Sequence, residues 1–221
     1  MMKSIVFLGC LCLALSAQID LEGKTDFQIW NGNTVYGHLN KHVDLFAKIE
    51  FRYKNSGTTF YYNHEEVELP IHTCSFFDIG PCYRQVFSLV NQDAGLWRTT
   101  YVPNLNATFF WHLGPYKFSD RSRFSYIIRT GSLMNAWQYR NKLTVYRVLS
   151  QKFHELRLFL DEEVFFEEGR PGLYQNRVSV GYNLGLFRKI RMDLAYRFRI
   201  VKITDAWERD NILVLNLYAD F

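Results

Sequence analysis

The sequence predicts an all-β protein: a single antiparallel up-and-down transmembrane β-barrel of about 12 strands, or alternatively 10, after a cleaved signal peptide. Three observations predict this fold. Apolar and polar residues alternate with a period of two along most of the chain. The first residues have the pattern of a secretory signal peptide. The last residues, NILVLNLYADF, form a strand-like alternation that ends on Phe221.

Residues 1–17 are the predicted signal peptide, and residues 18–221 are the predicted barrel. Lys3 supplies a positive charge, Ile5 to Leu15 are apolar, and small residues around Ala17 offer a cleavage site. The apolar stretch is too short for a membrane-spanning helix, which needs about 20 residues. The chain is therefore expected to be exported.

The composition fits this interpretation. Aromatic residues make up 17% of the chain, which is high for a soluble protein, whereas charged residues make up an ordinary 22%. The formal net charge of +4 is spread along the sequence, so no nucleic-acid partner is predicted. No catalytic, nucleotide, haem or metal motif of any specificity is present, and no cofactor is predicted.

The strands follow one another along the chain with the same two faces. In IRMDLAYRFRI, residues 190–200, Ile, Met, Leu, Tyr and Phe alternate with Arg and Asp. Comparable segments are VDLFAKIEFRY, TFYYNHEEVEL, NLNATFFWHLG, YKFSDRSRFSYIIR, WQYRNKLTVYRV, HELRLFLDEEVFF and YQNRVSVGYNLG. Short turns such as LGPY alternate with longer polar loops such as NQDAGLW, which is the rhythm of an outer-membrane barrel.

The number of strands depends on the first segment. About eleven segments are clear, whereas bacterial single-chain barrels have an even number of strands. Asn31-Gly32 is a strong signal for a two-residue hairpin and would divide residues 18–42 into two strands, which gives twelve. If those residues form one strand and another segment is not a strand, the number is ten.

Alternation alone does not separate a membrane barrel from a soluble, lipocalin-like periplasmic barrel, because the two place their apolar faces on opposite sides. Three features favour the membrane. The segments are longer than ordinary soluble strands and match a tilted crossing of about 9 to 11 residues. Aromatic residues gather toward segment ends, where interfacial girdles lie: Trp97, Tyr101, Trp111, Tyr116, Trp137 and Tyr139. The third feature is the closing strand.

That closing strand predicts where the protein goes. Its end on Phe221 resembles the C-terminal signal by which bacterial outer-membrane barrels are recognised for assembly. The predicted location is the bacterial outer membrane. The predicted partners are outer-membrane lipid and the barrel-assembly machinery, which would contact the last strand. The oligomeric state stays open.

The polar face would then line the interior. Its predicted charged residues are Arg123, Arg140, Arg157, Arg177, Arg197, Arg199, Glu50, Asp161 and Glu163. One interpretation is an ion-paired core, because buried charges are normally paired. The other is a narrow pore for small solutes, in which the six arginines attract anions. A lipid-modifying enzyme of the outer membrane is a further alternative, although no serine lies in a G-x-S-x-G motif.

Cys74 and Cys82 form a candidate disulfide. They are the cysteines that remain after residues 1–17, in a chain expected to reach an oxidising compartment. An extended chain would hold them too far apart, whereas a turn between them would bring them within disulfide range. Both alternatives stay open at this point.

The middle of the chain resembles a known family. VPNLNATFFWHLGPYKFSDRSRFSYIIR, followed by WQYRNKLTV, is similar to the bacterial domain-of-unknown-function 2490 family. The matching motifs are Ser119-Asp120-Arg121, Tyr139-Arg140-Asn141-Lys142, Tyr83-Arg84-Gln85-Val86-Phe87 and Gln175-Asn176-Arg177. The resemblance implies an exported bacterial β-barrel and supplies no activity, because the family is uncharacterised. Cys74 and Cys82 depart from its usual pattern.

Overall fold

The structure, a computed structural model, describes residues 25–131, 134–150, 155–170, 172–203 and 206–221. The predicted signal peptide, residues 1–17, lies outside the described residues. No helix in the described parts of the chain is long and apolar enough to cross a membrane. The strands are β1 (Thr25–His38), β2 (Asp44–Lys54), β3 (Thr59–Glu68), β4 (Ile71–Cys74), β5 (Phe77–Asn91), β6 (Leu96–Leu113), β7 (Tyr116–Arg129), β8 (Ala136–Ser150), β9 (Leu156–Glu167), β10 (Leu173–Phe187), β11 (Ile190–Ile203) and β12 (Ala206–Asp220).

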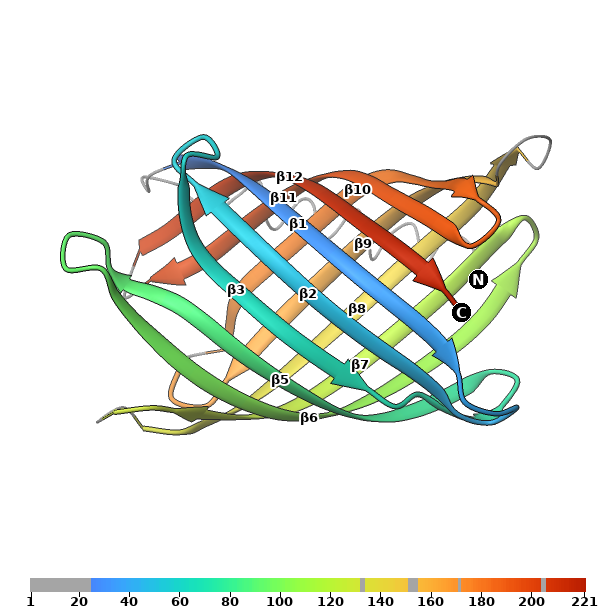
Figure 1. Cartoon of the computed structure of the whole chain (residues 1–221), viewed down its shortest axis with the longest axis horizontal. Coiled ribbons are helices and arrows are strands. Elements are labelled where there is room, and N and C mark those ends of the chain that lie inside the picture. The colour runs from blue at the N-terminus through green and yellow to red at the C-terminus, as the bar shows by residue number, and fades with distance from the viewer. Residues whose placement is uncertain (1–24, 132–133, 151–154, 171, 204–205) are drawn as a thin grey trace.

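These strands form one closed barrel (Figure 1). Strands next to each other in the sequence pair along the sheet, β1 pairs with β12, and β3 pairs with β5 to complete the ring. Eleven strands make up the ring, and the short β4 pairs with the start of β5 beyond the end of β3. The predicted all-β barrel of about twelve strands is confirmed.

The twelfth strand does not arise where the sequence predicts it. Asn31-Gly32 forms no hairpin but lies in the middle of the continuous β1, where Gly32 pairs with Glu50 on one side and Asn216 on the other. Continuous pairing with both neighbours overrides the local turn preference. The extra strand comes from Leu69-Pro70, which separates β3 from β4. Proline has no backbone N–H for the sheet ladder, so a strand is readily interrupted there.

The prediction of a wholly antiparallel sheet is wrong at one seam. β1 and β12 pair in parallel, from Thr25 beside Arg209 to Tyr36 beside Asp220. The cause is the odd number of strands in the ring. In an up-and-down sheet the strand direction alternates, so the first and eleventh ring strands run the same way. The expectation of an even number therefore fails for the ring itself.

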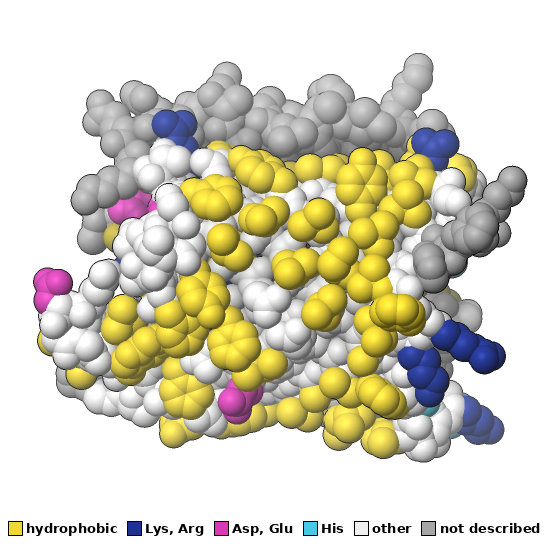
Figure 2. Space-filling model, turned by 45° about the horizontal axis from the view of Figure 1, so that its top comes forward, with side chains coloured by type: hydrophobic (Ala, Val, Ile, Leu, Met, Phe, Trp, Pro, Cys, Tyr) yellow, Lys and Arg dark blue, Asp and Glu magenta, His cyan; other side chains and the backbone are white. Residues whose placement is uncertain are grey.

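The apolar face of the sheet is on the outside. On β11, Leu194 and Tyr196 expose 42% and 48% of their surface, whereas Asp193 and Arg197 line the interior. Figure 2 shows the same arrangement across one wall, where hydrophobic side chains cover the middle and most Lys and Arg lie toward the ends. The exposed aromatic residues follow the predicted girdles: Trp97 and Trp137 lie near one end of their strands, and Trp111 and Tyr116 lie at the other.

The outer wall also carries a small polar cluster on β7 and β8. The Asn141 amide donates hydrogen bonds to Asp120 Oδ1 (2.6 Å) and Ser122 Oγ (3.3 Å), and the Ser122 hydroxyl lies 3.0 Å from that of Tyr139. These polar groups therefore satisfy one another on an otherwise apolar surface.

Candidate functional site: the barrel interior

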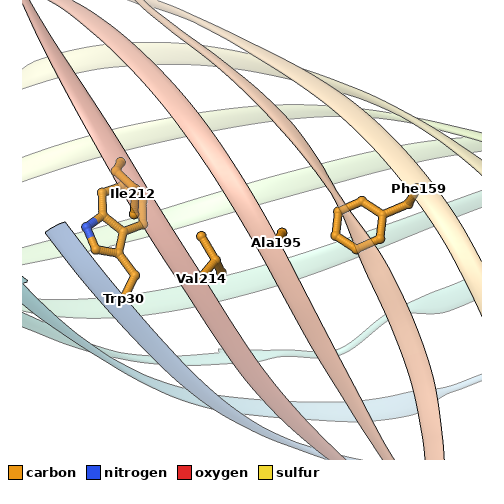
Figure 3. Close-up of a cluster of buried hydrophobic side chains, with 5 residues drawn as sticks. All are labelled: Trp30, Phe159, Ala195, Ile212 and Val214. Carbon is orange, nitrogen blue, oxygen red and sulfur yellow. The ribbon is translucent and has the colours of Figure 1, made fainter. Parts of the chain in front are cut away.

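The interior of the barrel holds a cavity of about 410 Å³ lined mainly by charged and polar side chains. The side chains come from every strand of the ring, because every second residue of a strand points inward. One side of the interior is apolar instead. Figure 3 shows this cluster, in which Trp30, Ile212, Val214, Ala195 and Phe159 lie in a row across β1, β12, β11 and β9.

Glu66 on β3 is the centre of one ion-pair group. Both of its oxygens accept hydrogen bonds from Arg123, at 3.0 and 2.8 Å. Arg84 Nε donates to the same carboxylate at 2.6 Å, and Arg123 Nε donates to Asn106 Oδ1 at 2.6 Å. Arg123 is 1% exposed, so this charge is stabilised by its partners rather than by water.

A second group surrounds two acids on β9. Arg140 and Arg177 lie 3.1 and 3.2 Å from the oxygens of Glu163. Asp161 Oδ2 is 3.1 Å from Lys142 Nζ and 4.0 Å from Arg197 Nη2. The register of β8, β9 and β10 explains the contacts, because Lys142 and Arg177 lie directly beside Glu163 on the two neighbouring strands.

Trp30 joins these groups to a third. The guanidinium of Arg52 lies 3.7 Å from the centre of the indole ring, and those of Arg177, Arg197 and Arg199 lie within 6.0 Å. Cations over an aromatic face are attracted by its quadrupole. Arg52 is also paired with Glu50, and Arg199 with Asp210. The indole N–H donates to Gln28 Oε1 at 2.9 Å. Side chains therefore fill the part of the interior around Trp30.

The structure brings most of the predicted interior residues together. Those in the three groups are Glu50, Arg123, Arg140, Asp161, Glu163, Arg177, Arg197 and Arg199. Arg157 is separate, because it pairs with Glu155 just before β9 begins. The six arginines expected to attract anions all have acidic partners, so the geometry favours the ion-paired core. The sequence does not identify Trp30 as an interior residue, because the hairpin signal at Asn31-Gly32 and the alternative of one long strand leave its face undecided.

Arg121 on β7 differs from the other cations of the cavity. It lines the cavity, yet its side chain makes no ion pair or hydrogen bond with any part of the chain that the structure describes. The sequence places it on the polar face but gives no sign that it lacks a partner, because pairing depends on side-chain geometry across the ring.

The candidate disulfide between Cys74 and Cys82 is not formed, and both thiols are free. Cys74 pairs with Phe77 across a turn, whereas Cys82 lies five residues further along β5. At about 3.3 Å per residue this is about 17 Å, far beyond the Cα separation of about 7 Å that a disulfide allows. Cys82 is buried, and its sulfur accepts a hydrogen bond from Asn104 at 3.6 Å.

Glu66, Glu68 and Cys82 are close enough together to suggest a metal site, with ligand atoms within 4.8 Å of one another. The surroundings do not fit one. Arg84 and Arg123 already neutralise Glu66, and the Arg123 guanidinium reaches within 3.8 Å of Glu68. A divalent cation would meet these guanidinium groups at close range.

A smaller charged group lies at the rim of the barrel. His72 on β4 is 3.0 Å from Asp44 through Nε2 and 3.0 Å from Asp78 through Nδ1. The hydrogen bond with Asp78, together with that from Asp44, raises the pKa of His72 above its ordinary value. Asp44 also contacts His38 at 2.8 Å. Protonated His72 therefore ties β2, β4 and β5 together.

Phe221 lies at the same end of the barrel. Its side chain is exposed, and its backbone N–H donates to the Tyr36 carbonyl at 2.9 Å, which extends the β1–β12 pairing by one residue. The Lys189 ammonium is 5.7 Å from the centre of its ring.

Comparisons with known proteins give one family match. The family described as "Protein of unknown function (DUF2490)" matches residues 27–210. No curated protein matches the sequence. Among solved structures, the beta domain of the Bordetella autotransporter Brka is 7% identical, with a TM-score of 0.48, covering 79% of this chain and 82% of that one. The siderophore receptor PirA from Pseudomonas aeruginosa is 12% identical, with a TM-score of 0.30, covering 74% of this chain and 32% of that one.

Proposed function

The chain belongs to the DUF2490 family of proteins of unknown function, as its sequence motifs predict, and we propose that it is an integral barrel of the bacterial outer membrane whose interior is held closed by ion pairs. Its role is then structural at rest, and it conducts small solutes only where the interior groups rearrange.

The observation that carries this proposal is the placement of the two faces. Outward side chains such as Leu160, Val180 and Leu213 are exposed and apolar, while ionised side chains are buried inside. A soluble barrel would have the reverse arrangement, because exposed apolar surface of this extent favours association. In lipid the same wall is stable, and a closed ring leaves no sheet edge with unpaired backbone groups.

Strand lengths and girdles support the same location. The ring strands contain 10 to 18 residues, enough for tilted crossings of about 9 to 11 residues with extensions into the headgroups. Aromatic residues at both ends of the strands suit the two membrane interfaces. Phe221, at the end of the pairing with β1, would serve as the signal read by the barrel-assembly machinery.

The interior supports a closed barrel rather than an open pore. Three ion-pair groups, joined at Trp30, occupy it, and their charges are paired with one another rather than presented to passing ions. The enzyme alternative gains no support from the outer wall. Ser122, the serine of the outer polar cluster, contacts Tyr139 and Asn141 rather than a histidine base.

The heat-shift test examines this proposal. The protein is extracted from bacterial membranes in detergent and run on a gel with and without boiling. We expect it to fractionate with the outer membrane and to change mobility on boiling. The Phe221→Ala variant should reach the outer membrane in smaller amounts, while Phe187→Ala, which changes an exposed turn-side phenylalanine, should not. Solubility without detergent and an unchanged band would overturn the proposal.

A further inference from the structure

We propose that Arg121 is the anion-binding group of the interior cavity and that its ligand is a small oxyanion, the carboxylate or phosphate group of a small solute. The inference goes beyond a closed membrane barrel. Because the site lies inside the ring, it does not depend on whether the barrel is found in the outer membrane.

The pairing of the other cations singles out Arg121. Eight of the nine lysines and arginines that line the cavity have an acidic partner within 4.0 Å, and among the described residues Arg121 has none. The eight are Lys48, Arg52, Arg84, Arg123, Arg140, Lys142, Arg177 and Arg197. A guanidinium carries five N–H donors and remains charged, so an acceptor is needed where water is restricted.

The neighbouring acids are engaged elsewhere. Arg121 lies within electrostatic range of Glu68, Glu163 and Glu66, but it forms an ion pair with none of them. Glu163 is held by Arg140 and Arg177, and Glu66 by Arg84 and Arg123. The nearest cation to Glu68 is Arg123, at 3.8 Å. On the neighbouring strands Arg121 stands beside Thr108 and Lys142, neither of which offers a negative charge. No acid of the described residues is within ion-pair distance of Arg121, so its N–H donors are left for a ligand.

Polar groups on the opposite wall complete the site. Tyr36 on β1 is within electrostatic range of Arg121, and Thr34, two residues earlier, lines the same cavity. Thr34 is only 3% exposed, and its buried hydroxyl has no hydrogen-bond partner in the described chain. An oxyanion between the two walls would accept from Arg121 on one side and from hydroxyl groups on the other.

The geometry of the group and the size of the cavity define the ligand class. The planar fork of a guanidinium matches the two oxygens of a carboxylate or phosphate. A cavity of about 410 Å³ lies at the small end of the range for ligand pockets, about 300 to 1,000 Å³. Glu68 lines the same cavity and would repel a solute that carries several negative charges. The favoured solute is small and carries one oxyanion group.

Calorimetric titration of the folded protein in detergent tests this assignment, with inorganic phosphate and acetate as separate arms and chloride at matched ionic strength as the reference. Wild-type protein should bind at least one oxyanion with saturation. Arg121→Gln should weaken that binding at least ~10-fold, a loss of about 1.4 kcal/mol. Arg121→Lys, which keeps the charge and loses the fork, should fall between the two.

Arg129→Gln is the matched control, because Arg129 is a β7 arginine outside the cavity lining that is paired with Glu167. It should bind within ~2-fold of wild type. The heat-shift test shows whether each variant is folded, so a failure of localisation and a failure of binding give different results. If Arg121→Gln does not fold, the oxyanion binding of Arg121→Lys is compared with that of wild type instead. The assignment is overturned if wild type binds neither oxyanion, or if the folded Arg121 variants bind as well as wild type does.

Discussion

Arg123 on β7 donates hydrogen bonds to both carboxylate oxygens of Glu66 on β3, although β5 and β6 lie between these two strands in the ring. The contact therefore joins strands that share no backbone hydrogen bonds. Both side chains are almost fully buried. Such a pair contributes to holding the cross-section of the barrel, in addition to the ladders that hold each neighbouring pair of strands.

Breaking this pair should destabilise the barrel more than removing it. Arg123→Met leaves a buried carboxylate with only Arg84 and should lower the free energy of unfolding by about 3–5 kcal/mol. The double variant with Glu66→Met should recover only part of that loss, because Arg84 then loses its acidic partner. The triple variant that also carries Arg84→Met should recover much of it, because no charge of the group is then left alone. Urea unfolding in detergent measures all three variants. A triple variant less stable than Arg123→Met would show that the unpaired charge is not the cause.

Trp30 should close the interior as well as stabilise it. Trp30→Ala removes a fully buried ring and its contacts with Arg52, so we expect a loss of about 3–5 kcal/mol and a higher single-channel conductance in planar bilayers. Trp30→Phe keeps a ring under the guanidinium and should stay nearly non-conducting. Equal conductance in wild type and Trp30→Ala would mean that the closure lies elsewhere.

The Asn216 side chain occupies the space that a Cβ at Gly32 would need. A Cβ at this position would lie 2.3 Å from Asn216 Oδ1 on β12. Gly32→Ala should therefore lower the free energy of unfolding by about 1–3 kcal/mol, seen as a lower temperature for the gel shift. Asn216→Ala in the same chain should restore it. Gly37→Ala on the same strand, where the nearest atom is 4.0 Å away, serves as the control and should change little.

The rim group should make stability depend on pH. Hydrogen bonds to Asp78 and Asp44 raise the pKa of His72 above its unfolded value of about 6.5. A group with a raised pKa stabilises the fold fully below the unfolded pKa, and this stabilisation is lost as the pH rises through the folded pKa. The temperature at which the gel mobility changes should therefore fall when the pH is raised above about 6.5.

His72→Gln should flatten this dependence. The effect should stay below ~1 kcal/mol, because the His72 side chain is 38% exposed and solvent screens the pairs. His42→Gln is the control, since the ring of that rim histidine makes no hydrogen bond within the described chain. A pH dependence that persists unchanged in His72→Gln would place its origin in another group.

The two cysteines should differ in reactivity. In protein that begins at residue 18, a maleimide-polyethylene glycol reagent should add once to the folded barrel, at the exposed Cys74, and twice after boiling in detergent, when Cys82 becomes accessible. Reducing agent should change neither result. A folded protein that reacts only after reduction would mean that the thiols pair after all.

Much of the fold could be predicted because alternation with a period of two is local information. The alternation within residues 190–200 predicts both faces of β11. It places Leu194 outside and Arg197 inside, as the structure has them. Closure is not local. Asn31-Gly32 has a strong turn preference, yet pairing with β2 and β12 keeps it extended. No feature of β1 or β12 alone predicts that these two strands pair in parallel.

The interior was harder to predict than the wall. The alternation along each strand identifies which residues point inward, but it does not identify the ion-pair partner of each one. Arg121 and Arg123 are two residues apart on the same strand and carry the same charge. Among the described residues, only Arg123 has an acid within ion-pair distance. Whether an arginine of β7 meets Glu66 depends on the order of β3, β5, β6 and β7 around the ring, which the sequence of one strand does not contain.

The parallel seam has a consequence for how the chain could be rewired. In an ordinary barrel with antiparallel closure, a short loop could join the last strand to the first, and the protein could then be opened at any other turn. Here Thr25 and Asp220 lie at opposite ends of the barrel, because β1 and β12 run in the same direction. A circular permutation would need a linker running the length of β1. Its 14 residues span about 46 Å at about 3.3 Å each, so at least about 14 extended residues would be required.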